Sequence, residues 1–359
     1  MRQFAVAAMV VGVLCVGYSG NDAPTGAPSS STTLIEPGAT TTTSTTTTST
    51  PSSTTIDDAA YDTMTALAFD DVAIYGRWMQ TSRTRKTDRI VRFDRAAGNM
   101  MFVDTVTSPL AALRAGPWLF VVVVVADDRC VTACTGELLR LDPRTMHIEQ
   151  RLPLDRVTAS LTLVGNTLWV PTAHGVVRVA VDTGEILPSP VGEFADTETI
   201  VGLTATDRPR RVYAAIAQGQ DRYALAAFDP TSGHVTARGP TIGSGPGGGN
   251  ISHGADGLWF SISTGMLGFS AKIDPDTLTR LDVRLDSQAR PKAHQGVGVL
   301  WVDESWGGFL SCGDPATGAM LWRTDIQTNP VSFARDTTGR MTPFQGWKPV
   351  VAPPVCAHG

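Results

Sequence analysis

A short turn motif centred on aspartate recurs along the chain at intervals of 40 to 48 residues. One copy lies in the stretch FLSCGDPATGAMLW, in which a cysteine, a glycine and an aspartate stand side by side. Repeats of this length are typical of architectures that copy one supersecondary unit and bury its apolar faces against its neighbours. The aspartates that define the repeat are Asp94, Asp142, Asp182, Asp229, Asp274 and Asp314.

The residues around each aspartate predict a strand followed by a tight turn. The position just before the aspartate is a large apolar residue in all copies except that at Gly313, and the position before that is Arg, Ala, Lys or Cys. Alternation with a period of two is typical of a half-buried strand. In the Asp-Pro-x-Thr-Gly sequence that follows, proline presets φ, aspartate accepts backbone N–H groups and glycine tolerates positive φ.

An aromatic residue inside an apolar triplet gives each repeat a second marker. The clearest copies are Leu168–Val170, Leu258–Phe260 and Leu300–Val302, each with a central tryptophan. Seven markers and six turns predict an all-β fold of seven units with the last unit incomplete, and six units is the alternative count. With the weaker copies, the markers are Tyr75, Phe120, Trp169, Tyr213, Trp259, Trp301 and Phe344, spaced 42 to 49 residues apart.

At these motifs the chain resembles the seven-bladed β-propellers of the YVTN and streptogramin-lyase-like repeat type. The segment GADGLWFS (254–261) is similar to the lyase-like repeat, and LDPRT, FDPTSG and GDPATG are similar to the YVTN-type turn. The resemblance covers roughly residues 57–359 and implies a β-propeller domain there. It implies little about activity, because this fold is found in binding proteins, lyases, lactonases and scaffolds.

The N-terminal residues MRQFAVAAMVVGVLCVGYSG are typical of an export signal. Arg2 precedes an apolar run that is too short for the roughly 20 residues needed to cross a bilayer. We therefore predict a signal peptide over residues 1–19 and a secreted or cell-envelope protein. A lipid anchor at Cys15 is the alternative, which is not favoured because Leu14 stands where such signals have a small residue.

Residues 20–56 consist largely of Ser, Thr, Pro and Gly. Such a segment lacks the apolar residues that offset the entropy of ordering, so it is predicted to be a disordered linker. Residues 57–359 can bury a large core. Their most apolar run, LFVVVVVA (119–126), has the length and bounds of a strand buried on both faces, and no membrane span is expected.

The charge balance limits the class of partner. The formal net charge is −5 and the sequence pI is about 5.7, whereas general nucleic-acid binders are usually basic. We therefore expect no nucleic-acid partner. The expected partner is a protein or a small-molecule ligand of unknown identity, and the chain itself is expected to be a monomer.

Four cysteines remain if Cys15 is removed with the signal peptide, and an even number in an exported chain favours disulfides. Cys130 and Cys134 are predicted to form a local bridge, which is favoured over a metal site because no histidine lies near them. Cys312 and Cys356 are 44 residues apart, so their bridge would join the last unit to its neighbour. Facing sheets lie about 10 Å apart and a disulfide needs Cα atoms within about 7 Å, so Cys356 must leave the strand register.

Two histidines are candidate site residues. His253 lies six residues before Trp259 and His294 lies seven before Trp301, which suggests a shared place at the end of the innermost strand. Two imidazoles at one channel mouth could serve acid–base chemistry or bind a divalent metal. The lyases that the repeat resembles use histidine with a carboxylate and a divalent ion, but neither histidine matches their motif. The other interpretation is that both are polar residues of the channel mouth.

These observations favour a non-enzymatic binding or scaffolding module of the cell envelope. The alternative is a metal-assisted lyase or lactone hydrolase with its site at the central channel mouth, near His253 and His294. The sequence leaves enzyme activity open but leans against it, because it contains no nucleophile elbow, zinc-protease motif or P-loop. No cofactor is predicted, and a divalent metal is implied only by the enzyme alternative.

Overall fold

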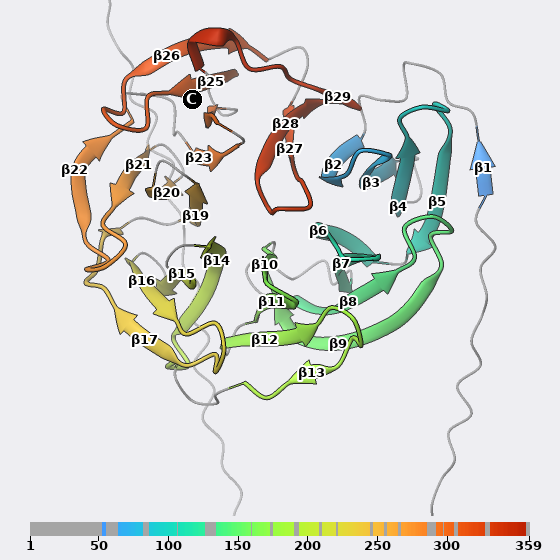
Figure 1. Cartoon of the computed structure of the whole chain (residues 1–359), viewed down its shortest axis with the longest axis horizontal. Helices are drawn as coiled ribbons and strands as arrows, with labels where there is room; N and C mark the ends of the chain where they lie inside the picture. The colour runs from blue at the N-terminus through green and yellow to red at the C-terminus, as the bar shows by residue number, and fades with distance from the viewer. Residues whose placement is uncertain are drawn as a thin grey trace, which may run out of the picture. The chain divides into compact units, whose positions relative to one another are not determined.

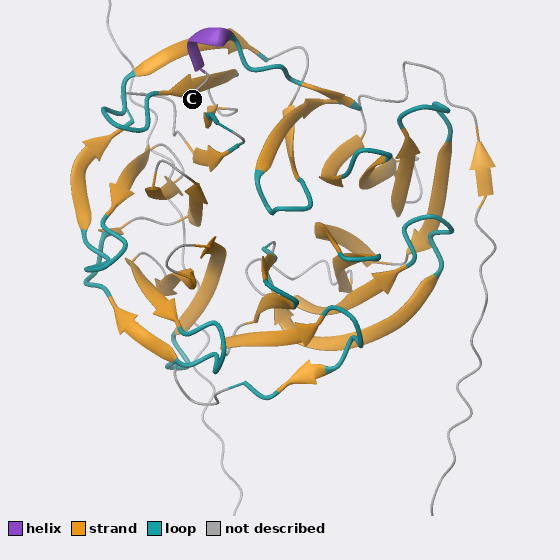
Figure 2. Cartoon of the chain, in the orientation of Figure 1, coloured by secondary structure: helices purple, strands orange, loops and turns teal. Residues whose placement is uncertain are grey.

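Short strands make up almost all of the regular structure of the described residues, and the one helical turn among them is η3 (Pro354–Cys356) (Figure 2). The computed structural model divides the chain into two units, Met1–Thr47 and Thr48–Gly359. The predicted signal peptide and the predicted linker, apart from Ser52–Thr54, lie outside the described residues and stay predictions. The described residues are 52–54, 64–81, 86–105, 107–125, 134–158, 160–172, 175–189, 194–207, 210–219, 222–244, 247–254, 257–264, 267–285, 292–296, 298–304, 308–326 and 331–356.

The strands of the second unit form successive antiparallel sheets, or blades. Blade 1 contains β2 (Met64–Phe69), β3 (Ala73–Thr81), β4 (Lys86–Asp94) and β5 (Met100–Thr105). Blade 2 contains β6 (Thr107–Ala115), β7 (Trp118–Val125), β8 (Cys134–Leu141) and β9 (Ile148–Val157). Blade 3 contains β10 (Thr162–Val164), β11 (Thr167–Thr172), β12 (Gly175–Ala180) and β13 (Ile186–Leu187).

The later blades repeat the same order of strands. Blade 4 contains β14 (Glu198–Asp207), β15 (Arg210–Gln218), β16 (Arg222–Phe228) and β17 (Val235–Arg238), and β18 (Gly243–Ser244) also pairs with β16. Blade 5 contains β19 (Gly247–Gly254), β20 (Gly257–Thr264), β21 (Leu267–Ile273) and β22 (Arg280–Arg284). Blade 6 contains β23 (Lys292–Gln295), β24 (Leu300–Glu304), β25 (Phe309–Gly313) and β26 (Met320–Asp325). Blade 7 contains β27 (Val331–Arg335), β28 (Met341–Gln345) and β29 (Lys348–Pro349).

The blades surround a common centre, with the first strand of each blade innermost (Figure 1). This arrangement is a seven-bladed β-propeller, as the sequence predicts. The prediction of an incomplete last blade is also confirmed, because blade 7 has three strands among the described residues and β29 spans only two residues. The ring closes where β27 lies beside β2, through a parallel pair between Arg335 and Ala68.

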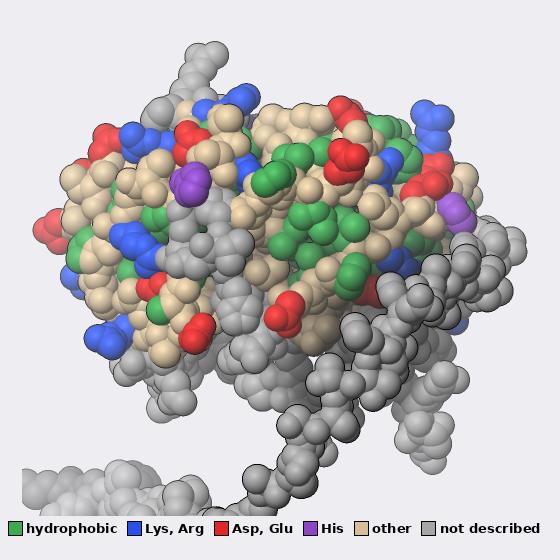
Figure 3. Space-filling view, turned by 90° about the horizontal axis from the view of Figure 1, so that it is seen from below, with side chains coloured by type: hydrophobic (Ala, Val, Ile, Leu, Met, Phe, Trp, Pro, Cys, Tyr) green, Lys and Arg blue, Asp and Glu red, His purple; other side chains and the backbone are tan. Residues whose placement is uncertain are grey.

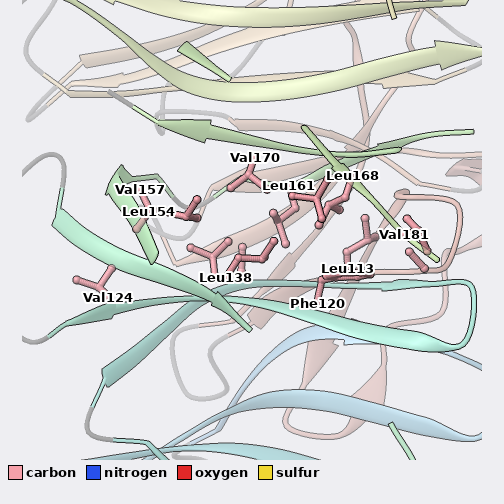
Figure 4. Close-up of a cluster of buried hydrophobic side chains, with 14 residues drawn as sticks. Leu113, Phe120, Val124, Leu138, Leu154, Val157, Leu161, Leu168, Val170 and Val181 are labelled. Atoms are coloured by element: carbon pink, nitrogen blue, oxygen red, sulfur yellow. The ribbon is translucent and has the colours of Figure 1, made fainter. Parts of the chain in front are cut away.

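The core consists of apolar clusters between neighbouring blades. Figure 4 shows the cluster between blades 2 and 3, in which Phe120 and Leu138 pack against Leu168 and Val170. The valine-rich strand β7 contributes alternate residues to this cluster and to the one between blades 1 and 2. It is therefore buried on both faces, as predicted. Each such side chain contributes roughly 1.5–3 kcal/mol when fully buried, so the ring is held chiefly by its inter-blade faces.

The aspartate turns connect the third and fourth strands of the blades. In five of them one aspartate oxygen accepts backbone N–H groups two or three residues later, as the Oδ1 of Asp314 does from Ala316 and Thr317. The prediction is wrong for Asp182. In blade 3 the N–H of Gly184 bonds to the carbonyl of Ala180, so Ala180 takes the place that aspartate has elsewhere.

One strand comes from the segment for which a linker is predicted. β1 (Ser52–Thr54) pairs antiparallel with β5, so it extends the outer edge of blade 1. β1 therefore adds to blade 1 and does not supply the strand that blade 7 lacks among the described residues. Closure of the ring between blades 7 and 1 depends instead on the β2–β27 contact and on an apolar cluster that includes Met64, Phe344 and Trp347.

On the outer side of the ring, polar side chains of one blade donate to the strand-connecting turn of the next. The guanidinium of Arg178 donates to the carbonyl of Thr231 at 2.7 Å, and the ammonium of Lys272 donates to that of Pro315 at 3.1 Å. Arg211 and Gln150 make similar contacts to Pro275 and Gly184. We call these contacts the turn contacts. They connect blade 2 to 3, 3 to 4, 4 to 5 and 5 to 6.

Candidate functional site

The two predicted site histidines do not share a register. His294 lies opposite Trp301, whereas the residue opposite Trp259 is Ser252, and His253 lies one place further along. Successive side chains of a strand point to opposite faces, so a shift of one residue reverses the side chain. The expectation that both imidazoles point into one cavity is therefore wrong.

The apolar clusters show which way each histidine faces. Leu258, opposite His253, packs with Tyr213 of blade 4, so His253 is on the blade 4 side of its sheet. Trp301, opposite His294, packs with Phe333 of blade 7. His294 is therefore on the blade 7 side of its sheet. The two side chains belong to different inter-blade interfaces.

His294 lies on the innermost strand of blade 6 and is 9% exposed. Its ring stacks on the ring of Phe333, with 4.2 Å between centroids and 21° between planes. Its Nε2 atom is buried and has no hydrogen-bond partner among the described residues. Burial, opposed by Asp303 and reinforced by Lys292 and Arg335, lowers the pKa of His294 to about 4, so the imidazole is neutral at physiological pH.

Arg335 ends the innermost strand of blade 7, two residues after Phe333, and alternation therefore places it on the face toward blade 6. Desolvation lowers its pKa to about 10, so it remains a cation at neutral pH. Its Nη1 donates to the carbonyl of Gly339 at a long 3.4 Å, and none of the described ion pairs involves it. The unpartnered Nε2 of His294 thus lies near a cation whose printed side-chain contact is one long hydrogen bond.

At the equivalent position, blades 4 and 7 have hydroxyl groups with partners, whereas blades 1 and 2 have the apolar Ala68 and Leu113. Thr204, opposite Tyr213, accepts the N–H of His253 at 3.2 Å. Ser332, opposite Phe344, accepts the N–H of Ala66 at 3.0 Å. Each hydroxyl thus bonds one innermost strand to the next. His294 occupies this position in blade 6 and supplies an imidazole in place of a hydroxyl.

The neighbouring carboxylates have different surroundings. Asp303 lies opposite Lys292 and shares the face of His294. Glu304 follows on the other face, 1% exposed, where Arg323 pairs with it at 2.7 Å and the Ser311 hydroxyl donates to it at 3.2 Å. The charge of Glu304 is therefore compensated by Arg323, and Asp303 is the carboxylate that faces the candidate site.

Cys312 and Cys356 form a disulfide with 5.8 Å between their Cα atoms. Cys356 lies in η3, beyond the last strand, so it leaves the strand register as the geometric argument required. Both residues are buried in the cluster between blades 6 and 7. The predicted Cys130–Cys134 bridge stays a prediction, because Cys130 and the side chain of Cys134 lie outside the described residues.

The disulfide occupies a position that is polar in blades 3 and 5. Arg178 lies opposite Trp169 and Lys272 lies opposite Trp259, and both make turn contacts. Cys312 lies at the same place, opposite Trp301. In blade 6 the bridge to Cys356 therefore takes the place of the turn contact.

Within the described ranges, no group of three or more His, Cys, Asp and Glu side chains is placed to hold a metal ion. No helix in this part of the chain has the length and apolar character needed to cross a membrane. Seen from the side, acidic and basic side chains are interspersed around smaller apolar areas (Figure 3). This face presents no continuous patch of one charge.

Sequence reasoning named His294 but missed its stacking partner Phe333. The signal was present in the segment SFAR of the last repeat, where alternate residues must face the same neighbour. The sequence also indicated that the two histidines face opposite ways. His253 lies six residues before its tryptophan and His294 lies seven before its own, and a difference of one residue reverses the side chain. Register, rather than approximate spacing, decides which side chains meet.

Solved structures with similar folds are β-propellers. A hydrazine synthase from Kuenenia stuttgartiensis has a TM-score of 0.54 and 10% identity, with 80% of this chain and 96% of that chain covered. The Dos1 propeller has a TM-score of 0.52 and 12% identity, with 74% and 73% covered. For the dihydro-heme d1 dehydrogenase NirN the values are 0.48 and 15%, and the match covers 82% of this chain but 66% of that chain.

No protein-family model and no curated protein sequence matches the chain. The hydrazine synthase is an enzyme, and at 10–12% identity it and the Dos1 propeller carry information about fold alone. The comparisons therefore show that this chain has the β-propeller fold.

Proposed function

We propose that this chain is an exported cell-envelope β-propeller that acts as a non-enzymatic binding module. One observation carries the proposal: the buried Nε2 of His294 has no partner among the described residues, whereas the equivalent hydroxyl groups of blades 4 and 7 each have one. A buried polar group without a hydrogen bond costs about 1–3 kcal/mol. A ligand that supplies the missing bond would recover this free energy, which is the physical basis for binding there.

The innermost strands support a binding role because they position the site rigidly. His294 is held by its stack on Phe333, and Trp301 packs beside both. The lyase or lactone hydrolase alternative predicts two imidazoles acting together. The opposite orientations of His253 and His294 give that alternative no support at these residues.

Export is supported by two features. The N-terminal apolar run has the length of a signal peptide, and Cys312 and Cys356 form a disulfide of the kind that persists in oxidising compartments. Removal of residues 1–19 is the corresponding proposal. N-terminal sequencing of the protein recovered outside the cytoplasm tests it, because a retained Met1 would contradict cleavage.

Native mass spectrometry of protein purified from its producing cells tests the binding role. We expect a non-covalent small molecule to remain bound, to be lost from His294→Leu, and to be kept by His253→Leu, which changes the opposite face. The ligand recovered after incubation with fresh protein should be chemically unchanged. Conversion of the ligand, or equal retention by both variants, would contradict a non-enzymatic role for this site.

A further inference from the structure

The interface between blades 6 and 7 has an excess of positive charge. Lys292 and Asp303 face it from blade 6, and Arg335 faces it from blade 7. The neutral imidazole of His294 adds no charge. Among the described residues, two cations therefore face one carboxylate, which leaves one positive charge in excess.

Arg335 is the cation whose shape suits bidentate recognition of an oxyanion. Guanidinium groups present several N–H donors in a planar fork, and here one of them makes a single long bond to the Gly339 carbonyl. The pKa of Arg335 falls only to about 10 on desolvation, so the group stays charged. A desolvated guanidinium of this kind favours an oxyanion with two acceptor oxygens.

His294 provides the second polar contact. Stacking on Phe333 fixes the plane of the imidazole, and its Nε2 is the ring atom without a partner. Depending on its tautomer or protonation, Nε2 donates to an oxyanion or accepts from a protonated one. A metal cation is disfavoured because it would be repelled by Arg335 and Lys292.

We propose that the interface between blades 6 and 7, at the carboxyl ends of β23 and β27, binds the carboxylate or phosphate group of a small soluble ligand through Arg335 and His294. This inference rests on the proposed function and assigns a ligand class to the same site. The oxyanion neutralises the excess positive charge, gives the Nε2 of His294 a partner and supplies further acceptors to the guanidinium of Arg335.

Titration of the oxidised full-length protein with inorganic phosphate and, separately, with acetate tests the proposal. Binding is followed by calorimetry and by the NMR shift of the His294 ring proton at constant ionic strength, with sodium chloride as the reference. We expect saturable binding of one of the two anions in excess of chloride. Tighter binding of phosphate identifies a phosphate group, and tighter binding of acetate identifies a carboxylate.

Two substitutions that remove the same charge make the test specific. Arg335→Met is expected to weaken binding at least about ten-fold, since charge-assisted hydrogen bonds are the strong ones. Arg340→Met changes the neighbouring turn and is expected to leave the affinity within about two-fold. Equal affinity of both variants, or a wild-type shift no larger than that with chloride, would overturn the oxyanion assignment.

The pH dependence gives an independent measurement. A bound anion favours the imidazolium form and raises the pKa of His294 above its free value of about 4. Phosphate and acetate themselves take up protons over this range, and that contribution is common to the wild type and to His294→Gln. The ratio of the wild-type affinity to the affinity of His294→Gln should therefore increase as pH falls from 7 to 5. If the native ligand is retained by Arg335→Met while neither anion binds, the oxyanion inference fails and the binding function remains.

Discussion

The interface between blades 6 and 7 differs on both its outer and inner sides from the interfaces among blades 3 to 6. On the outer side, Arg178 and Lys272 donate to the turns of the next blades, whereas Cys312 at the same place is bonded to Cys356. On the inner side, the hydroxyl of Thr204 bonds to the next innermost strand, whereas His294 stacks on Phe333 and leaves Nε2 without a partner.

The difference follows from the incomplete last blade. A turn contact needs an acceptor carbonyl between the third and fourth strands of the next blade, and the described part of blade 7 has three strands. The segment after β29 returns to blade 6 instead, where Cys356 is buried in the cluster of that interface. A covalent bond thus replaces the missing contact on the outer side of this interface.

Loss of the disulfide should have the largest effect on stability. A bridge that closes a loop of 44 residues typically contributes about 2–5 kcal/mol. Cys312→Ala should therefore lower the free energy of unfolding in denaturant by about that amount. Cys312→Lys should lower it similarly, because the described part of blade 7 offers no turn carbonyl. If Cys312→Lys were as stable as the wild type while Cys312→Ala was not, a turn contact could form in blade 6, which would contradict its replacement by the disulfide.

Acidification should lower the free energy of unfolding through His294, on the inner side of this interface. The folded-state pKa of His294 is about 4, below its ordinary 6.5, so the unfolded chain takes up a proton first. Stability should therefore fall between about pH 6.5 and 4, by at most about 1.4 kcal/mol per pH unit from this group. A denaturant series over this range should give a smaller decline for His294→Thr, and equal declines would contradict burial of a neutral imidazole.

The turn contacts should rank by burial. Arg178→Met removes a charged donor whose residue is 5% exposed and should cost about 1.5–3 kcal/mol. Lys272→Met should cost about 1 kcal/mol, because the ammonium is less buried. Arg211→Met should cost less still, as its side chain is 37% exposed. Thermal unfolding of the three variants checks this order, and equal losses would mean that the contacts do not depend on desolvation.

The smallest expected effect concerns the hydroxyl groups. Thr204→Val leaves the N–H of His253 without its acceptor and should cost about 1 kcal/mol. Ser332→Ala should cost a similar amount at the closure of the ring. In blade 6, His294→Thr should be more stable than His294→Ala by up to about 1 kcal/mol, because only threonine supplies a hydroxyl. Chemical unfolding of each variant and its reference protein measures these differences. Identical free energies of unfolding would show that the hydroxyl groups do not stabilise the contact between blades.

Sequence periodicity was sufficient to predict the fold because each blade repeats the same burial pattern. The aromatic markers Trp169, Trp259 and Trp301 all lie in second strands, and the aspartate turns follow third strands in five blades. Asp182 was misassigned because Asp-Thr-Gly also fits the later positions of the turn that Ala180 begins. A matching motif does not by itself show which residue begins the turn, and here the assignment was shifted by two residues.

The candidate site was less predictable because it depends on parity and on contacts between blades. The count from His294 to Trp301 located the residue, but the choice of neighbour needed the strand register. His294 stacks on Phe333 and lies near Arg335, and both of these residues are about 40 positions away in sequence. The periodicity of residue types within one repeat does not report such contacts between blades. The spacing of Cys312 and Cys356 by one repeat, in contrast, did indicate the bridge.

Hydrogen exchange of the oxidised and reduced protein tests most directly whether the disulfide closes the ring at blade 7. We predict that reduction increases exchange in β25 to β29 and in the tail as far as Cys356, because these segments share the bridged interface. Exchange in blades 2 to 5, which have turn contacts, should stay unchanged. Unaltered protection of β27 and β28 after reduction, or equal loss in every blade, would contradict this account.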